Sequence, residues 1–188
     1  MATYDTLKSR INKGDVIILD GAIGTQLQAM GAPMHPASWA AGALVTHAST
    51  VRKMHQDYIK AGADIITTNT YSSARHNIEK MGLSEQTLEL NLRAVVLAKE
   101  ARDRVATSDV WIAGAISTFG AVTEKQVSGA AAYYRQTNMM GSSGRFRRWF
   151  GSLTEQSVRD NLREQAEVLA EAGVDFLLGE STGDAEQR

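Results

Sequence analysis

The residues of this chain best suited to chemistry are carboxylates that follow short apolar runs. Asp20 comes directly after Val16–Leu19, and Glu180 ends a second such run near the end of the chain. Gly21 and Gly24 then open a turn behind Asp20. Parallel α/β folds carry their binding and catalytic groups at the carboxyl ends of the strands. The alternative is that Asp20 only caps the following helix and that the glycines only make a tight turn.

Polar residues also follow the apolar starts of two other predicted strands. Residues 67–70 read Thr-Thr-Asn-Thr directly after two isoleucines, and Ser117 and Thr118 follow the apolar run 110–116. If these strands are parallel, their polar ends meet at one edge of the sheet, together with Asp20. Polar side chains gathered there must be hydrogen-bonded either to each other or to a ligand, and the sequence leaves both possibilities open.

Helices and strands must alternate along the chain to place these residues. An Ala-Gly-x-Asp motif twice ends a helix directly before a strand, at 61–64 and at 172–175. Four strands separated by helical crossovers indicate a parallel sheet, and the uninterrupted apolar run of the first strand predicts burial on both faces. Apolar periodicity and turn residues predict helices at 4–13, 44–61, 72–81, 84–105 (with Ser84 as N-cap) and 155–172 (with Thr154 as N-cap), and strands at 16–20, 65–71, 110–116 and 174–179.

Two architectures fit this order of elements: a doubly wound sheet and part of a (β/α)₈ barrel. The chain contains no G-x-G-x-x-G motif, which weakens the dinucleotide-binding alternative. A complete barrel takes about 250 residues, so a chain of 188 residues with four strands corresponds to close to half of one.

Two connections are predicted to lack regular structure. Two prolines exclude a regular helix from the loop 31–39, so its Trp39 is either a packed plug or a lid over a site, and the plug is the favoured interpretation. The stretch 121–150 contains the basic and aromatic cluster Arg145–Trp149. Without a wider basic surface, such a cluster is more often a solvated loop than a contact to phosphate or nucleic acid.

Composition argues against several classes of protein. With a net charge of −1 and 22% charged residues, the chain has no overall field that would attract nucleic acid or an anionic membrane. It contains no cysteine and therefore offers neither a disulfide nor a thiolate metal ligand. No apolar run is long enough to span a bilayer, and the N-terminus lacks the pattern of a signal peptide, which predicts a cytoplasmic protein.

Four stretches resemble the successive strand motifs of the homocysteine S-methyltransferase family. They are Leu19-Asp-Gly-Ala-Ile-Gly-Thr-Gln-Leu27, Ala61-Gly-Ala-Asp-Ile-Ile-Thr-Thr-Asn-Thr-Tyr71, Ala113-Gly-Ala-Ile-Ser117 and Ala172-Gly-Val-Asp-Phe-Leu-Leu-Gly-Glu180, in the order of the family. The resemblance implies that residues 1–188 are the N-terminal portion of a (β/α)₈ TIM-barrel domain, with about the first four βα units present. It also implies methyl transfer from a sulfonium, betaine-type or folate donor to homocysteine, which forms methionine.

The resemblance further implies roles for individual residues. Asp20 and Glu180 match the acids that hold the amino group of homocysteine, and a pair of carboxylates suits an ammonium group because that group has three donors. Asn69 matches a polar residue near the ligand, and Gly21 matches a turn where the backbone approaches the substrate. Ser117 matches a residue of the third-strand loop beside the substrate.

Zinc ligation is the main departure from the family. The family holds zinc with one cysteine near the sixth strand and a cysteine pair near the eighth, and the metal keeps the homocysteine sulfur as a thiolate. Here His35, His47, His55 and His76 lack the i, i+4 pairing of a helix-borne zinc site. We therefore expect the family's zinc ligands to lie beyond Arg188, and no zinc-dependent turnover by this chain alone.

Three functional hypotheses follow from these observations. The first is the N-terminal half of a homocysteine S-methyltransferase. The second is a non-catalytic half barrel that associates with itself or with a second half, because four parallel strands leave an exposed sheet edge. The third is a different barrel enzyme that uses Asp20 and Glu180 as acid and base on an unrelated substrate.

Overall fold

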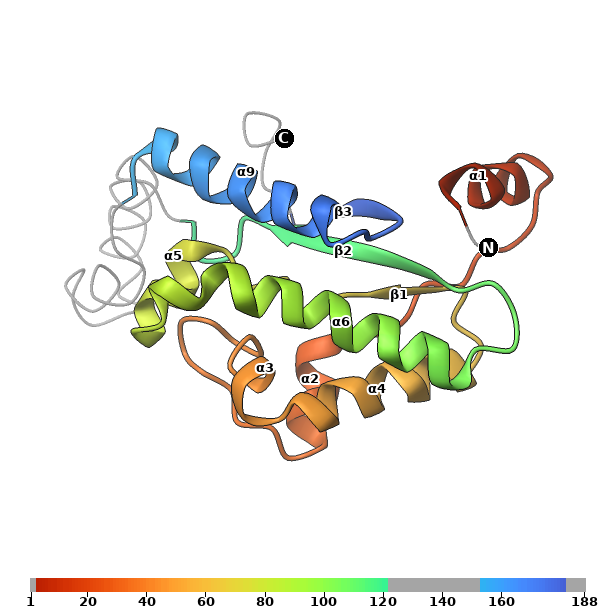
Figure 1. The fold of residues 1–188 in the computed structure, drawn as a ribbon, viewed down its shortest axis with the longest axis horizontal. Helices are drawn as coiled ribbons and strands as arrows, with labels where there is room; N and C mark the ends of the chain where they lie inside the picture. The colour runs from red at the N-terminus through yellow and green to blue at the C-terminus, as the bar shows by residue number, and fades with distance from the viewer. Residues whose placement is uncertain (1–2, 122–152, 182–188) are drawn as a thin grey trace, which may run out of the picture.

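Three parallel strands form one sheet in the computed structural model, which describes residues 3–121 and 153–181 (Figure 1). Within these ranges the strands are β1 (Ile65–Thr67), β2 (Trp111–Ser117) and β3 (Phe176–Glu180), in the order β1-β2-β3. β2 pairs in parallel with both neighbours, and at its carboxyl end Ser117 lies opposite Glu180. The predicted α/β fold with a parallel sheet is therefore confirmed.

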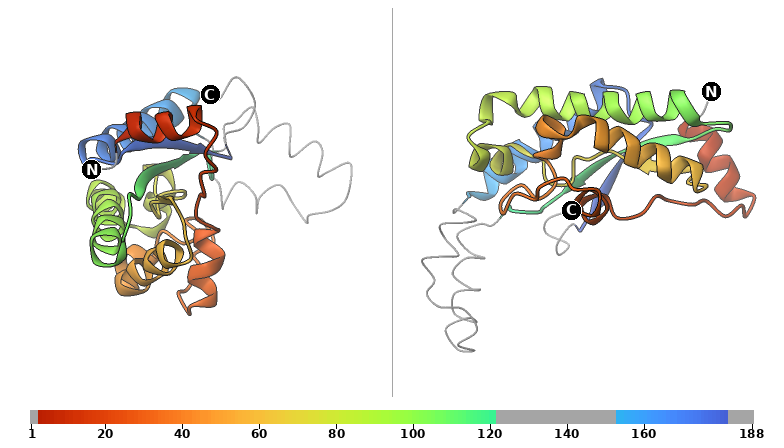
Figure 2. Two further views of the ribbon diagram at one scale, coloured as in Figure 1. Left: turned by 90° about the vertical axis from the view of Figure 1, so that its right-hand side faces the viewer. Right: turned by 90° about the horizontal axis from the view of Figure 1, so that it is seen from below.

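Helices cover one face of this sheet. The helix α4 packs on α6, α6 packs on α9, and each of the three also contacts a strand (Figures 1 and 2). The apolar layer beneath them includes Ile66, Ala98 and Ile112, all fully buried. The helices are α1 (Tyr4–Asn12), α2 (Ile23–Ala29), α3 (Ala43–Thr46), α4 (Ala48–Lys60), α5 (Arg75–Ile78), α6 (Thr87–Val105) and α9 (Glu155–Glu171), with 3₁₀ turns η1 (Glu79–Met81) and η2 (Ser84–Gln86).

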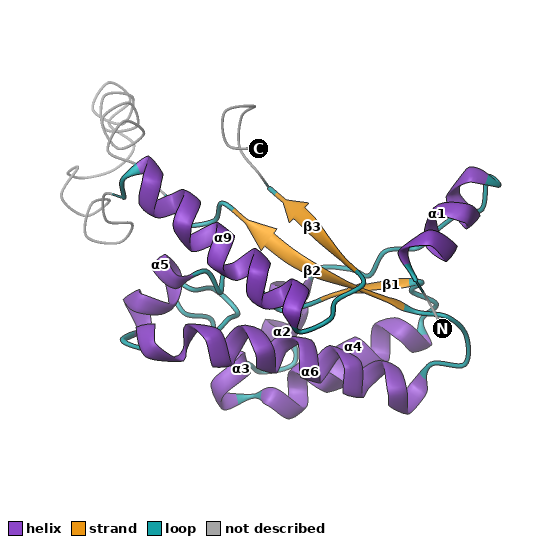
Figure 3. Cartoon of the chain, turned by 45° about the horizontal axis from the view of Figure 1, so that its top comes forward, coloured by secondary structure: helices purple, strands orange, loops and turns teal. Residues whose placement is uncertain are grey.

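The opposite face of the sheet is closed at its amino end by α1, which stands apart from the other helices (Figure 3). Leu7 of α1 packs in a buried cluster with Ile65 and Trp111. The indole Nε1 of Trp111 donates a 2.8 Å hydrogen bond to the carbonyl of Thr3, and the guanidinium of Arg10 lies 5.6 Å from the centre of the same ring system. The carboxyl end of this face remains available for a pocket.

Two helix starts show how far capping residues predict the structure. Thr154 caps α9 as predicted, because its hydroxyl accepts a 3.0 Å hydrogen bond from the backbone N–H of Ser157. Ser84 does not cap the next predicted helix. It begins the 3₁₀ turn η2, and its carbonyl accepts a 2.7 Å hydrogen bond from the hydroxyl of Thr87. The helix predicted at 44–61 is divided into α3 and α4 at His47, whose φ of −134° is not helical.

The strand predicted at 16–20 is wrong. This segment makes a single parallel bridge, between Leu19 and Ile65, and Val16 is 76% exposed. The carbonyl of Ile18 accepts hydrogen bonds from Asp64 and Ile65, so the segment is held to β1 on one side. In the described ranges no strand pairs with its other side, and an apolar run is buried on both faces only where both neighbours are present.

Two other expectations differ from the structure or lie outside it. The strand predicted at 65–71 ends at Thr67, and the residues that follow turn toward α5. The cluster Arg145–Trp149 lies outside the described residues. Within the ranges that are described, no helix combines the length and apolar character needed to cross a bilayer.

His55 is an unusual member of the core. Its side chain on α4 is fully buried, and neither ring nitrogen has a hydrogen-bond partner among the residues that the structure describes. Burial lowers the pKa of His55 from its ordinary value of 6.5 to about 4, because the charged form has no solvation there. The unfolded chain therefore takes up this proton at a higher pH than the folded chain does.

Acid should destabilise the fold partly through His55. As the pH falls through 6.5 toward 4, the unfolded state is favoured, by on the order of 2 kcal/mol at pH 5. The variant His55→Leu should show a smaller loss of unfolding free energy between pH 7 and pH 5 than wild type, measured by urea denaturation. Met54→Leu, an adjacent and equally buried substitution, is the matched control. Equal pH dependence in both variants would contradict the role assigned to His55.

Candidate functional site

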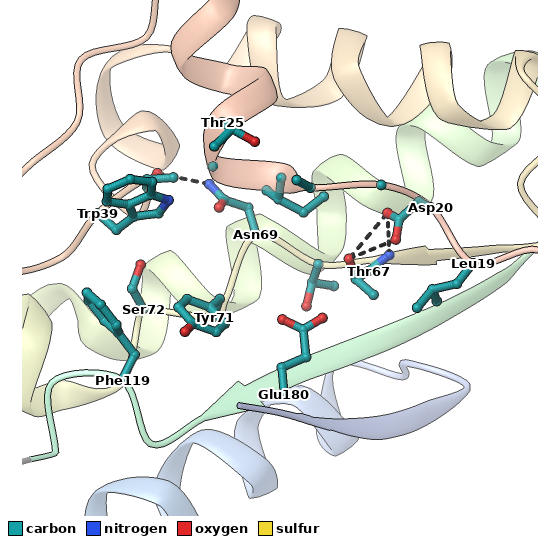
Figure 4. A pocket seen from close by; sticks show the side chains of 16 residues that line it. Leu19, Asp20, Thr25, Trp39, Thr67, Asn69, Tyr71, Ser72, Phe119 and Glu180 are labelled. Atoms are coloured by element: carbon teal, nitrogen blue, oxygen red, sulfur yellow. Dashed lines mark hydrogen bonds between the residues drawn. The ribbon is translucent and has the colours of Figure 1, made fainter. Parts of the chain in front are cut away.

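A pocket of about 400 Å³ lies at the carboxyl ends of the strands (Figure 4). The carboxylates of Asp20 and Glu180 and the side chain of Asn69 all line it, as does the backbone at Gly21. These four sequence-predicted site residues are thus brought together, whereas Ser117 is not in the lining. The full lining comprises Leu19, Asp20, Gly21, Ala22, Ile23, Gly24, Thr25, Trp39, Ala40, Thr67, Thr68, Asn69, Tyr71, Ser72, Phe119 and Glu180.

Asp20 is fixed in the pocket by Thr67. The backbone N–H of Thr67 donates to Oδ2 of Asp20 at 2.8 Å, and the Thr67 hydroxyl lies 3.1 and 3.2 Å from the two carboxylate oxygens. The backbone N–H of Asp20 in turn donates to the carbonyl of Ile65 at 2.9 Å. Asp20 therefore joins its segment to the end of β1. It does not cap α2, whose N-cap is Ala22 and which has no side-chain cap.

The two carboxylates share a poorly solvated environment. Burial raises the pKa of Asp20 to about 7, despite the hydrogen bonds from Thr67, and the negative charge of Glu180 raises it further. Burial also raises the pKa of Glu180 above its ordinary range. A cation between these groups would favour their ionised forms and would relieve the repulsion between them.

Both glycines of the first turn have neighbours that exclude a side chain. A Cβ atom at Gly21 would lie 2.9 Å from the hydroxyl of Tyr58, and that hydroxyl donates to the carbonyl of Ala22 at 3.0 Å. A Cβ at Gly24 would overlap the indole ring of Trp39. The turn therefore needs glycine so that Tyr58 and Trp39 can pack directly on its backbone.

The polar cluster after β1 is mostly satisfied within the protein. The hydroxyl of Thr70 donates to the carbonyl of Ala115 at 2.7 Å and lies 2.7 Å from that of Thr68, which accepts from the backbone N–H of Ala115. The amide nitrogen of Asn69 donates to the carbonyl of Ala40 at 3.0 Å. These side chains tie β1 to β2 and to the proline loop, so they satisfy one another as well as facing the pocket.

Ser117 is buried behind the pocket. Its side chain is 1% exposed, and its hydroxyl accepts a 3.0 Å hydrogen bond from the backbone N–H of Phe119. Phe119 itself lines the pocket, and its ring centre lies 5.4 Å from that of Tyr71. The strand-end rule that selected Ser117 thus identified the correct loop, although the residue that reaches the pocket lies two positions later.

Tyr71 and Phe119 are the aromatic residues of the lining that sequence reasoning missed, whereas Trp39 was predicted to be a plug or a lid. Trp39, Tyr71 and Phe119 lie together on one side of the pocket, and Asp20 lies on the other (Figure 4). Trp39 packs on the backbone of Gly24, as the plug interpretation predicts, and it is also 37% exposed where it lines the pocket, as the lid interpretation predicts. Tyr71 could have been identified, because it directly follows the polar residues that end the predicted second strand.

Side chains that could bind a metal are not grouped together in the described parts of the chain. Across residues 3–121 and 153–181, no group of three or more His, Cys, Asp or Glu side chains is arranged to hold a metal ion. His76, for example, has Nε2 3.0 Å from the carbonyl of Phe119 and is otherwise buried. The described residues therefore do not fit a zinc site.

Comparison with known proteins places this geometry in a family. The family model of homocysteine S-methyltransferase matches residues 17–187. Homocysteine S-methyltransferase 4 of Zea mays is 31% identical over 170 residues, which cover 89% of this chain and 48% of that protein. Homocysteine S-methyltransferase of Escherichia coli K12 is 31% identical over 127 residues, which cover 64% of this chain and 41% of that protein.

A solved structure extends the likeness to three dimensions. The metallated form of the homocysteine methyltransferase MmuM from Escherichia coli matches with a TM-score of 0.69 and 26% identity, over 93% of this chain and 56% of that chain. The present chain thus spans about half the length of the relatives it matches. Since the family model matches nearly all of its residues, the chain belongs to the homocysteine S-methyltransferase family.

Proposed function

We propose that residues 1–188 are the N-terminal portion of a (β/α)₈ barrel that binds homocysteine and a methyl donor, and that the complete protein forms methionine. One observation carries the proposal: Asp20 and Glu180 reach one pocket whose other side is lined by three aromatic rings. Family membership supports the reaction class, and the methyl donor is inferred from the lining.

The carboxylate side of the pocket suits the amino group of homocysteine. An ammonium group has three donors, and Asp20 and Glu180 present acceptors toward the same space. Because Thr67 already holds Asp20 in place, little conformational entropy is lost when the substrate binds. The raised pKa of Asp20 means that an incoming ammonium group also displaces a proton near neutral pH.

The aromatic side of the pocket suits a cationic methyl donor. The faces of Trp and Tyr rings attract sulfonium and quaternary ammonium groups electrostatically, and desolvation strengthens the attraction. Trp39 and Tyr71 provide such faces here. We therefore favour a sulfonium or betaine-type donor over a folate, which would use these rings for stacking alone.

Methyl transfer itself forms a bond between the homocysteine sulfur and the methyl carbon. The bond from that carbon to the donor's positive sulfur or nitrogen breaks, and its electron pair stays on the donor. In the family, zinc keeps the attacking sulfur as a thiolate. Because the described residues do not fit zinc, we assign this chain the binding of both substrates and propose that the metal ligands are supplied from outside it.

Methyltransferase activity should require the complete reading frame. We expect the transcript beyond Arg188 to encode further βα units with a cysteine and then a cysteine pair, and the full protein to form methionine from homocysteine. Glu180→Gln should raise the KM for homocysteine by about 10–100-fold, because a charge-assisted hydrogen bond is lost. A reading frame without those cysteines, or an unchanged KM, would contradict the proposal. Glu155→Gln, at the start of α9, is the matched control.

The buried carboxylate of Asp20 should lower the folding stability of the protein at neutral pH. Because its pKa rises from 3.8 to about 7 on folding, the contribution of Asp20 to wild-type stability falls as the pH rises through this interval, opposite in sign to the contribution of His55. Asp20→Asn should therefore gain thermal stability relative to wild type between pH 4 and pH 8, while its homocysteine affinity falls. The loss of one Thr67 hydrogen bond is the same at both pH values and cancels in this comparison. A difference in melting temperature that does not change with pH would be inconsistent with the raised pKa.

Self-association of a non-catalytic half barrel is the second candidate. It is favoured by the exposed apolar residues Val16, Ile18 and Leu19, which are 76%, 48% and 47% exposed on the segment bridged to β1. Such an unpaired apolar edge favours pairing with another chain.

Sedimentation velocity of the 188-residue chain tests this candidate. If the edge mediates association, the chain should sediment as a dimer or larger species, and Val16→Glu should convert it to a monomer. Val96→Glu, at a position that is 50% exposed on α6, is the control and should leave the assembly intact. A monomeric wild-type chain would exclude self-association as its function.

A further inference from the structure

We infer that residues 69–77 form a positioning segment for the aromatic side of the pocket. This segment contributes Tyr71, and it holds the other two aromatic residues, Trp39 and Phe119, in place. The placement of the rings is inferred from hydrogen bonds in the structure. Its consequence for donor binding rests on the proposed function.

Trp39 is held through the carbonyl groups of the two residues beside it in the chain. The hydroxyl of Ser72 donates to the carbonyl of Ser38 at 2.6 Å, and the amide of Asn69 donates to the carbonyl of Ala40 at 3.0 Å. These carbonyls belong to the residues immediately before and after Trp39. Trp39 itself has a φ of +45°, a strained value for a residue with a side chain, so the surrounding contacts must hold it there.

Phe119 is held through its own carbonyl. Nε2 of His76 lies 3.0 Å from this oxygen, and the amide of Asn77 donates to it at 2.8 Å. Burial lowers the pKa of His76 to about 4, so the ring is neutral at pH 7 and must donate from Nε2. Its Nδ1 is then an acceptor, 3.4 Å from the amide nitrogen of Asn161 on α9.

The side chains that position the rings are much more deeply buried than Trp39. Asn69, Ser72, His76 and Asn77 are at most 3% exposed, whereas Trp39 is 37% exposed. Water therefore cannot readily replace a hydrogen bond that is lost at these buried positions. If Asn69 or Ser72 were substituted, the carbonyl of Ala40 or of Ser38 would lose the only side-chain donor that it has among the described contacts. One short segment thus sets the mutual placement of three rings from three loops.

A fluorine NMR experiment on the unliganded 188-residue chain tests the Trp39 contacts. The three tryptophans are labelled as 5-fluorotryptophan and assigned by single Trp→Phe substitutions. Ser72→Ala should shift and broaden the Trp39 resonance and leave that of Trp111 unchanged, because Trp111 is buried at the other end of β2. The unchanged Trp111 signal also reports that the variant is folded.

Ser73→Ala is the matched control. Ser73 is equally buried and adjacent, but its hydroxyl bonds to Thr70 and Asn91 and not to the loop that carries Trp39. Its loss should leave the Trp39 resonance as in wild type. A Trp39 resonance unaffected by Ser72→Ala, or equally affected by both substitutions, would overturn the inference. If Ser72→Ala does not fold, the chain is labelled with 4-fluorophenylalanine and Asn77→Ser is tested instead. The Phe119 resonance should then shift and broaden, and an unaffected Phe119 resonance would overturn the inference.

Titration with trimethylsulfonium separates this inference from the proposed function. Wild type should bind the probe with a shift of the Trp39 resonance, and Ser72→Ala should bind about tenfold more weakly, as expected for one buried hydrogen bond. Equal affinity in both proteins would contradict the positioning role. Absence of binding by wild type would refute the cationic donor, whereas the placement of Trp39 would still be decided by the unliganded spectra.

Discussion

The hydrogen bonds between Asp20 and Thr67 are the constraint on which the pocket depends. The segment before Asp20 makes a single β-bridge and a few backbone hydrogen bonds, and the carboxylate adds hydrogen bonds to Thr67 at the end of β1. The same burial that makes these hydrogen bonds effective also raises the pKa of Asp20 to about 7. The pocket therefore holds a carboxylate that is costly to ionise, and a cation beside it would stabilise its charged form.

The two sides of the pocket use different physical interactions. Asp20 and Glu180 offer charge and acceptors from two segments at opposite edges of the sheet, and β2 lies between them. The aromatic side is instead built on loops, which depend on buried hydrogen bonds to keep their rings in place. Such a division is what the proposed reaction with two substrates requires, because an amino acid and a cationic methyl donor would be recognised by separate groups.

Family membership explains why the pocket is well formed although metal ligands are not grouped among the described residues. The chain covers about half of its relatives, and the strand ends in this half carry the binding groups described above. Val16 and Leu19 are exposed because, in the described ranges, no strand pairs with the outer side of their segment. The open edge, and the lack of grouped metal ligands among the described residues, agree with the proposal that this chain is one part of a larger barrel.

The sequence by itself determined the features that depend on local interactions. The cap at Thr154, the alternation of helices and strands, the parallel sheet and the positions of Asp20 and Glu180 all follow from periodicity and from turn residues. Tertiary structure alone decided that Ser117 is buried outside the lining of the pocket and that Val16, Ile18 and Leu19 remain exposed. It also decided the convergence of the aromatic rings and the pKa of Asp20, because these arise from contacts between residues more than 25 positions apart, such as the 47 between Asp20 and Thr67.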